Sequence, residues 1–500
     1  MKRHYPMNSA GPVHRLFLSD RRLQWMLLVF MVLCYGIILS HAGLHRPARP
    51  MNRTFNSMLE HLVHGRFDVD PNVIGVEGFL HNGRVNAYWG ITCALLRLPL
   101  FLVNRLDLDV TAWSCLVAVC LAGMMKIRTV LFIRRHCGIG PGSEWAFILM
   151  LVYIVLGGAE VGYLKSSVYQ EVVFWAIAFA AIFVYFAVKG LVIGEFTLVT
   201  LSWMAMAAGL ATLTRVSTGL GLCMAFGLLL LVLVVEDTRA RRVAFLRFLV
   251  PAVVLGVFLI VVGAVNYFRW GNPTTFTDYT HYIVNLRDPD RMLQMQTNGL
   301  FNVARIPFGF IYYFLPLWSF QGVDGRLFFQ STQTRMMDLV ELPPSSFFLT
   351  DLLPIAFIVF LAMALWSSRS LLLRKGARSE QAANSLPFSG ISALVEGVAV
   401  AVGLAVPCIL MLMAMCMCYR YRMEFYPEID FLAFLGLYAT VRNSALLALF
   451  DRCRGWMLGA TVTSIVSAFT VVVLYNLAPF GTLKPYLRNG FFQYYLHSPY

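Results

Sequence analysis

Residues 169–188 read YQEVVFWAIAFAAIFVYFAV, and after the first three positions every side chain in this stretch is aliphatic or aromatic. About twenty such residues, rising about 1.5 Å each in a helix, cover the roughly 30 Å hydrocarbon core of a bilayer. Runs of this kind occur eleven times along the chain, at residues 23–42, 111–133, 144–160, 169–188, 196–213, 216–235, 248–266, 351–367, 390–417, 428–447 and 456–477. The sequence therefore predicts an all-α polytopic membrane protein with about eleven transmembrane helices.

The composition agrees with this fold class. Hydrophobic residues make up 59% of the 500 residues and charged residues 13%, against about 25% charged in a soluble protein. The net charge of +14 does not indicate a nucleic-acid partner, because the basic residues fall in short clusters between apolar runs rather than on one solvated face. The ten cysteines include no C-x-x-C pair, so we expect neither a zinc site nor a redox motif.

Basic clusters set the predicted orientation. With the N-terminus in the cytoplasm, the clusters at 128–135, 239–247, 369–378 and 442–454 all lie inside, as the positive-inside rule requires. We then expect a cytoplasmic basic tail at 1–22, with the first run acting as a retained signal anchor.

The same orientation divides the rest of the chain. Residues 23–478 are expected to form one transmembrane domain with two long outer loops, at 43–110 and 267–350, and residues 479–500 an outer C-terminal tail. A polar, small-residue stretch at 376–389 is expected to be a flexible cytoplasmic loop.

Both outer loops are rich in aromatic residues and are predicted to be ordered at the membrane surface. A helix lying in the interface is indicated by apolar side chains at helical spacing, Phe55, Met58, Leu59 and Leu62. Residues 88–103 are apolar but short, so an interfacial helix is expected there too. In the second loop, an interfacial belt is expected, with a sugar-stacking wall as the alternative, from Tyr312, Tyr313, Phe314 and Trp318.

The first outer loop carries the candidate catalytic acids Glu77, Asp68 and Asp70. A carboxylate at the membrane surface can accept a proton from a hydroxyl nucleophile, which is general-base catalysis. Each acid taken singly also fits a solvated loop. Asp68-Val-Asp70 could alternatively hold a divalent metal ion, whereas three nearby histidines match no zinc pattern and are expected at the surface: His61, His64 and His81.

The segment after Glu77 reads NGRVNAYWGITCALLRLP at 82–99, a turn with Gly-Arg, then Trp-Gly, then an apolar stretch ending at Pro. An acid followed by this pattern resembles the GT-C superfamily of membrane glycosyltransferases. The closest resemblance is to bacterial relatives of the dolichyl-phosphate-mannose protein mannosyltransferases and the aminoarabinose transferases. Glu77 occupies the acidic position, where Asp is commoner, and Asn86 stands where Tyr is expected.

Four further elements carry the resemblance across about residues 20–450. They are Tyr169-Gln-Glu171, Gly209 to Arg215, Asn266 to Pro273, and Tyr419 to Pro427, each at the outer end of a predicted span. The candidate residues for binding the sugar and its phosphate are Arg84, Tyr88, Glu171, Arg215, Arg269, Arg420 and Arg422.

The outer arginines run against the positive-inside bias, so each needs a counter-anion or water. Guanidinium binds phosphate in a bidentate fork, and the resemblance implies a polyprenyl-phosphate-linked sugar as donor. Arg215 and Arg420 are the strongest phosphate candidates, because each lies within one of these elements. The alternatives are snorkelling to headgroups or pairing with Glu160, Glu171 or Glu424.

The resemblance implies sugar transfer from the lipid donor to a hydroxyl of a lipid, glycan or protein acceptor, by single displacement. It places the enzyme in the bacterial inner membrane with its active site facing the periplasm, with no cofactor and no nucleic acid, and with a metal only as the alternative given above. A lipid or polysaccharide transporter and a glycan ligase remain alternatives. Transport is disfavoured because the central parts of most predicted spans are nearly free of ionisable residues.

Overall fold

The computed structural model describes residues 19–40, 50–138, 142–239, 245–316, 343–375 and 390–477. Within these ranges the secondary structure is helical apart from one short β-hairpin, with loops and turns between the helices, so the chain is an all-α polytopic membrane protein, as predicted. Outside the described residues lie most of the basic tail, Trp318, the loop at 376–389 and the C-terminal tail at 479–500.

Each of the eleven apolar runs coincides with helix. The long helices are α1 (Asp20–Leu39), α6 (Thr111–Cys137), α7 (Ser143–Val152) continuing through η5 (Tyr153–Gly157) into α8 (Ala159–Gly162), α9 (Val168–Ile193), α10 (Leu198–Thr212), α11 (Val216–Arg239), α12 (Phe245–Trp270), α18 (Leu352–Lys375), α20 (Ile391–Met413), α21 (Tyr426–Arg442), α22 (Ser444–Arg452) and α23 (Arg454–Leu477).

Not every run is a full span. Eight helices among the described residues are long and apolar enough to cross a membrane, and a ninth counts if α21 and α22 are taken together. Those two helices meet at a 102° bend, where the Asn443 side chain caps α22 by accepting from the Ala445 and Leu446 amides. Since α10 and the apolar part of α18 are shorter, the count of eleven stays a prediction.

Local signals explain where the central helix begins and ends. The Ser167 side chain caps the first turn of α9 by accepting from the Gln170 amide. Gly194 ends the helix in the left-handed region at φ 77°, a conformation that glycine adopts without steric cost. α9 packs against α6, α10 and α21 and is buried along most of its length.

Glycines allow close helix contacts in the bundle. A Cβ on Gly436 of α21 would lie 2.0 Å from the Phe357 carbonyl oxygen of α18, and one on Gly403 of α20 would lie 2.1 Å from the Ala225 amide nitrogen of α11. Apolar burial drives helices together only weakly inside a membrane, so such backbone contacts supply much of the packing.

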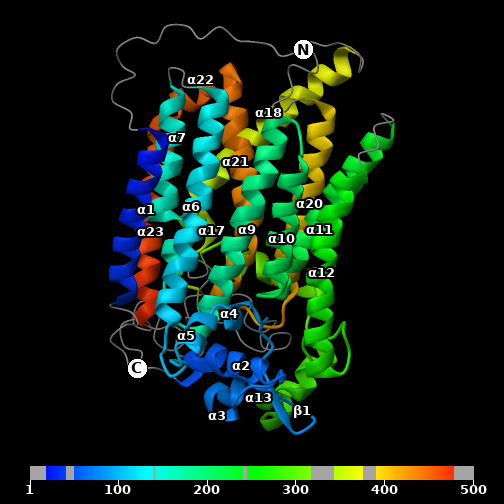
Figure 1. The fold of residues 1–500 in the computed structure, drawn as a ribbon. Helices are drawn as coiled ribbons and strands as arrows, with labels where there is room; N and C mark the ends of the chain where they lie inside the picture. Colours follow the sequence, from blue (N-terminus) through cyan, green and yellow to red (C-terminus); the bar gives the residue numbers. More distant parts are fainter. Residues whose placement is uncertain are drawn as a thin grey trace.

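The outer loops gather at one end of the bundle, opposite α22 (Figure 1). The first contains η3 (Pro50–Arg53), α2 (Thr54–Val63), α3 (Pro71–Ile74), η4 (Gly75–Glu77), β1 (Phe79–His81), β2 (Arg84–Asn86), α4 (Thr92–Leu95) and α5 (Leu98–Leu102). The second contains η6 (Tyr279–His281), α13 (Ile283–Arg287), α14 (Pro289–Asn298), η7 (Val303–Arg305), α15 (Ile306–Phe314) and α17 (Phe347–Thr350), and the short helix η9 (Tyr419–Phe425) follows α20.

Two expectations about the outer loops need correction. The helix through Phe55 and Met58 exists as α2, but both side chains are fully buried, because α2 packs under the bundle against α4 and α5 rather than facing lipid. Tyr312 and Tyr313 are also buried, so they do not form an interfacial belt. Residues 88–103 do form only short helices, α4 and α5, as predicted.

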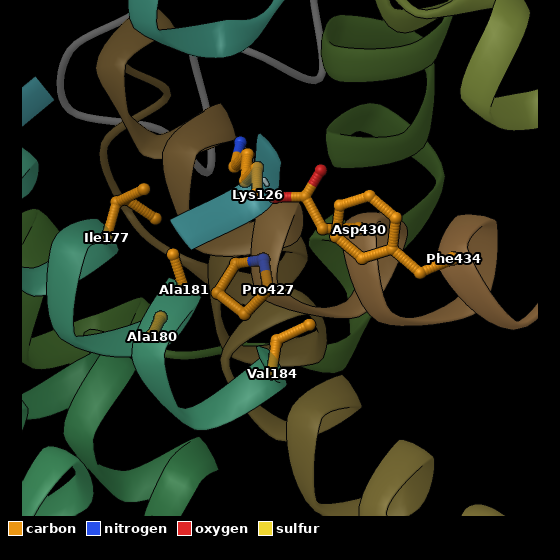
Figure 2. Close-up of a pocket in the computed structure, with 8 residues that line it drawn as sticks. All are labelled: Lys126, Ile177, Ala180, Ala181, Val184, Pro427, Asp430 and Phe434. Carbon is orange, nitrogen blue, oxygen red and sulfur yellow. Dashed lines mark ion pairs between the residues drawn. The ribbon is translucent and has the colours of Figure 1, made fainter. Parts of the chain in front are cut away.

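The bundle interior is also more polar than the sequence suggested. Lys126 lies near the middle of α6 and forms ion pairs with Glu160 of α8 and Asp430 of α21, and Figure 2 shows Lys126 and Asp430 beside a small pocket. Lys126 is therefore an exception to the expectation that the central parts of most spans are nearly free of ionisable residues, whereas Glu160 and Asp430 lie near the ends of their apolar runs. The cluster was not predicted because its three members lie in different runs, and only the fold brings them together.

Candidate functional site

A cavity of about 530 Å³ opens at the outer end of the bundle, where both outer loops meet α11, α20 and η9. Its polar lining includes Tyr88, Arg215, Thr274, Thr275, Thr277, Tyr279 and Tyr421. Its apolar lining includes Val172, Leu220, Leu300, Phe301, Leu410 and Met411. The cavity therefore joins a polar outer rim to an apolar wall made by transmembrane helices.

Glu77 lies directly behind the polar rim. The Tyr282 hydroxyl donates to Glu77 Oε2 at 2.9 Å, and the Tyr169 hydroxyl also hydrogen-bonds this carboxylate. The half-buried carboxylate therefore has phenol partners from the second outer loop and from α9. Phenol donors of this kind orient a carboxylate.

Tyr88 connects Glu77 to the two arginines. Burial raises the pKa of Tyr88 to about 12, and the Glu77 charge adds to this, while the positive charges of Arg420 and Arg215 oppose it. Glu77 and Arg420 share Tyr169 as a contact, and Arg420 and Arg215 share Tyr421, so a chain of contacts links these three groups beside the cavity. The structure thus brings together four of the sequence-predicted site residues.

The backbone around Glu77 is held from both sides. Asp70 caps α3 by accepting from the Asn72 amide at 2.8 Å, and Gly75 turns the chain at φ 60° just before Glu77. Beyond it, the Ile283 amide donates to the Gly78 carbonyl at 3.0 Å, which ties the second loop to the first.

Arg420 and Arg215 flank Tyr421 at the rim. The Arg420 guanidinium carbon lies 4.6 Å from the Tyr169 ring centroid and 5.4 Å from that of Tyr421, and the Arg215 guanidinium lies 5.5 Å from the Tyr421 centroid. Such cation–π contacts orient a guanidinium without neutralising its charge. The two groups are thus arranged around one aromatic side chain.

Arg215 also has the acidic partner that the sequence offered as the alternative. Its Nε contacts Glu424 Oε1. Ser217 and Thr218 donate to the same carboxylate at 2.7 and 2.6 Å. Glu424 therefore fixes the Arg215 side chain at the edge of the cavity.

Two of the predicted binding residues are instead tied to buried partners away from the cavity lining. Glu171 accepts two hydrogen bonds from Arg97 Nη2, at 2.6 and 2.8 Å, and both side chains are buried. Arg422 donates to Thr350 Oγ1 at 2.6 Å and to Asp351 Oδ2 at 3.1 Å, and is fully buried. Their placement is that of structural ion pairs.

The other two predicted arginines also lie off the lining. Arg269 is buried and donates to the Trp89 carbonyl at 2.7 Å, so it supports the backbone beside Tyr88. Arg84 is exposed at the tip of the hairpin, next to the turn formed by Asn82 at φ 50° and Gly83 at φ 72°. Neither side chain faces the cavity.

Asp68 and Asp70 have other partners. Burial acts to raise the pKa of Asp68, but hydrogen bonds from Arg66 and His61 outweigh it and hold that pKa below its ordinary value. Asp70 is the cap of α3. Among the described residues no three His, Cys, Asp or Glu side chains are placed to hold a metal ion, and both acids of the Asp-x-Asp motif are engaged elsewhere.

Several residues at the site escaped the sequence analysis. Tyr282, Tyr279 and the threonines at 274–277 come from the second loop, which carries no recognisable motif after Pro273. Arg97 lies within the quoted 82–99 segment, but its pairing with Glu171 spans 74 residues of sequence. The aromatic richness of the second loop was the available signal.

No family model matches this chain, and no curated protein matches it. The solved structures similar to it include two oligosaccharyltransferases. One is the archaeal oligosaccharyltransferase AglB from Archaeoglobus fulgidus in complex with an inhibitory peptide and a dolichol-phosphate, at a TM-score of 0.43 and 10% identity, over 91% of this chain and 56% of that one.

The other is an Archaeoglobus fulgidus oligosaccharyltransferase tethered to an acceptor peptide containing the NVT sequon. Its TM-score is 0.40 and its identity 11%, over 90% of this chain and 55% of that one. This chain thus spans about half the length of both neighbours. Likeness at this level assigns neither an activity nor a substrate.

Proposed function

We propose that this chain is an integral-membrane glycosyltransferase of the GT-C type. It moves a sugar from a polyprenyl-phosphate-linked donor to an acceptor hydroxyl at the outer face of the membrane. The observation that carries the proposal is the chain of contacts from Glu77 through Tyr169, Arg420 and Tyr421 to Arg215, beside a cavity whose opposite wall is apolar. The motif resemblance at 82–99 supports the same function.

The cavity has the two kinds of surface that such a donor requires. Its apolar wall, which includes Leu220 and Met411, suits a polyprenyl chain entering from the bilayer. Arg215 lines the rim and Arg420 lies beside it against the Tyr421 ring, and guanidinium pairs with phosphate oxygens through bidentate, charge-assisted hydrogen bonds. Aromatic side chains around the rim, Tyr88 and Tyr279 among them, offer faces against which a sugar ring can stack.

The proposed reaction is a single displacement. The acceptor oxygen bonds to the anomeric carbon as the bond from that carbon to the phosphate oxygen breaks, and the hydroxyl proton passes to Glu77. The departing polyprenyl phosphate gains negative charge, which Arg215 and Arg420 stabilise. Inversion at the anomeric carbon is what the resemblance implies.

The proposed setting is the bacterial inner membrane, with the cavity on the periplasmic side. The acceptor is a hydroxyl of a lipid, a glycan or a protein. The proposed chemistry uses no metal ion, because the leaving group is a monophosphate and two cationic side chains stand beside it.

The test is sugar transfer from synthetic polyprenyl-phosphate sugars by the full-length protein in nanodiscs. Glu77→Gln keeps the size of the side chain but removes the base, so kcat should fall by about 10²–10⁴-fold. Glu60→Gln is the matched control, because Glu60 is an exposed acid of the same loop, and its activity should equal that of the wild type. Full activity of Glu77→Gln would remove Glu77 from the base role.

One observation favours a second candidate, a lipid or polysaccharide transporter. Lys126, Glu160 and Asp430 form a charged cluster inside the bundle, and intramembrane charges often mark transport pathways. Movement of the labelled lipid across the bilayer, without consumption of its sugar, would favour this function. A glycan ligase would instead transfer a preassembled oligosaccharide and leave monosaccharide donors unused.

A further inference from the structure

Three charged side chains from different helices meet inside the bundle, away from the cavity. Lys126 Nζ lies 2.6 Å from Glu160 Oε1 and 2.8 Å from Asp430 Oδ2. The side chains of Lys126, Glu160 and Asp430 are only 4%, 1% and 13% exposed. Figure 2 shows Lys126 and Asp430 facing each other above Pro427.

The charges of this cluster do not balance. One ammonium group faces two carboxylates, and Asp351, whose charge also acts on Asp430, is balanced by Arg422 in a pair of 3.1 Å. The remaining titratable neighbours are phenols: Tyr426, whose ring lies 5.7 Å from Lys126 Nζ, Tyr153, which donates to Asp351, and Tyr35, which donates to the Val155 carbonyl. With both acids ionised, the cluster would have one uncompensated negative charge inside the membrane.

Such a charge is unstable there. An ion held in a low-dielectric interior without a counter-ion costs several kcal/mol even after relaxation. A titratable group in that position takes up a proton and becomes neutral. The acid cluster therefore favours binding one further positive charge.

An unpartnered oxygen within the cluster points the same way. Glu160 Oε2 is buried and has no hydrogen-bond partner among the described residues. The cavity beside Lys126 and Asp430 is only about 10 Å³, which is room for about one water molecule. The carboxylate oxygens of the cluster therefore have fewer donors than they can accept.

We propose that the Lys126–Glu160–Asp430 cluster binds one proton inside the bundle, on one of its two carboxyl groups. The proton makes the cluster neutral and so stabilises the packing of α6, α8 and α21. Because α21 follows directly on η9, which contains Tyr421 of the cavity lining and Arg420 against the Tyr421 ring, the cluster anchors the helix that positions these groups. The proposal is independent of sugar transfer.

Infrared difference spectroscopy of the intact protein in nanodiscs tests this directly. At neutral pH the wild type should show the C=O band of a protonated carboxyl group, which Glu160→Gln and Asp430→Asn should each remove. In Lys126→Met the two acids lose their counter-ion, so both should protonate and the band should grow to about twice its area. Glu195→Gln, at an exposed acid, should change nothing, and bands from other buried acids such as Glu428 should persist throughout.

Stability against pH gives a second measurement. The folded protein holds a proton that the unfolded chain releases, so the wild type should lose stability as the pH rises. Glu160→Gln cannot lose that proton and should lose less stability over the same range. A carboxyl band that survives in both Glu160→Gln and Asp430→Asn would overturn the proposal. A second result would also overturn it: a wild-type protein that lacks the band and is stabilised by sodium chloride but not by N-methylglucamine chloride. The bound positive charge would then be a sodium ion rather than a proton.

Discussion

Replacing Glu171 by Gln separates a structural acid from a substrate ligand. Glu171 opens α9, and its two oxygens accept from Arg97 Nη2 at 2.6 and 2.8 Å, with both side chains almost fully buried. Arg97 Nε also donates to Asn56 Oδ1 at 3.1 Å. The pair therefore fastens the first outer loop to the central helix.

The structure sets the expected magnitude. Glu171→Gln leaves a buried guanidinium with amide partners and no counter-ion, and removing one member of a buried ion pair costs about 3–5 kcal/mol. The double variant Arg97→Met/Glu171→Leu removes both charges, and it should recover much of that loss. Sugar transfer per folded molecule should be unchanged in both variants.

The assay is unfolding of the protein in mixed micelles, followed by transfer activity normalised to the folded fraction. A cycle of Arg97→Met, Glu171→Leu and the double variant isolates the pair from each residue's other contacts. If Glu171→Gln kept wild-type stability and lost activity, Glu171 would be a substrate contact and the structural assignment would be wrong.

Other predictions concern stability at Asp68 and Gly436 and sugar transfer at Arg420. Asp68→Asn should lower stability at neutral pH by only about 1 kcal/mol, since its arginine partner is half exposed. Because the pKa of Asp68 is lowered in the folded protein, pH-dependent unfolding should show this difference above the ordinary pKa near 4 and lose it as the pH falls through the lowered pKa. Gly436→Ala places a Cβ 2.0 Å from the Phe357 carbonyl oxygen and should cost about 1–3 kcal/mol, whereas Gly256→Ala, with no atom within 4 Å, should be tolerated in the same unfolding assay. Arg420→Gln should lower kcat/KM for sugar transfer by about 10-fold or more, which corresponds to about 1.4 kcal/mol per factor of ten. Arg420→Lys keeps the charge and should retain part of the activity. Equal rates for the wild type and both variants would exclude Arg420 from phosphate binding.

The apolar runs predict the fold class well, because hydrocarbon requires each span to satisfy its own backbone hydrogen bonds as a helix. They predict less well which helices cross completely. The run at 428–447 is one apolar stretch, yet Asn443 breaks it into two helices bent by 102°. A single capping side chain decides that geometry, and hydropathy averaged over a window does not detect it.

The candidate site was predicted in part. Tyr88 and Arg215 line the cavity, and Arg420 and Glu77 are linked to them through Tyr421 and Tyr169. Arg422 is two residues from Arg420 and has the same charge, yet it is fully buried against Asp351. Sequence separates these two arginines poorly, because only the path of η9 determines which of them lies beside the cavity residue Tyr421.

Pairings distant in sequence were beyond prediction for the same reason. Lys126, Glu160 and Asp430 lie in three different apolar runs, and Asp430 lies 304 residues from Lys126 by their positions. Their ion pairs arise only when α6, α8 and α21 pack together. Helix ends, turns and amphipathic spacing are local and can be read, whereas a buried ion pair depends on the tertiary fold.

Photo-crosslinking with a diazirine-bearing polyprenyl-phosphate sugar tests whether the lipid donor binds in the cavity. The proposal predicts adducts on the apolar wall of the cavity, at Leu220, Phe301 or Met411, that disappear when unlabelled donor is added in excess and weaken in Arg420→Gln. Adducts that resist this competition, or that map instead to the lipid-facing groove between α1 and α6 around Leu33 and Trp113, would contradict it.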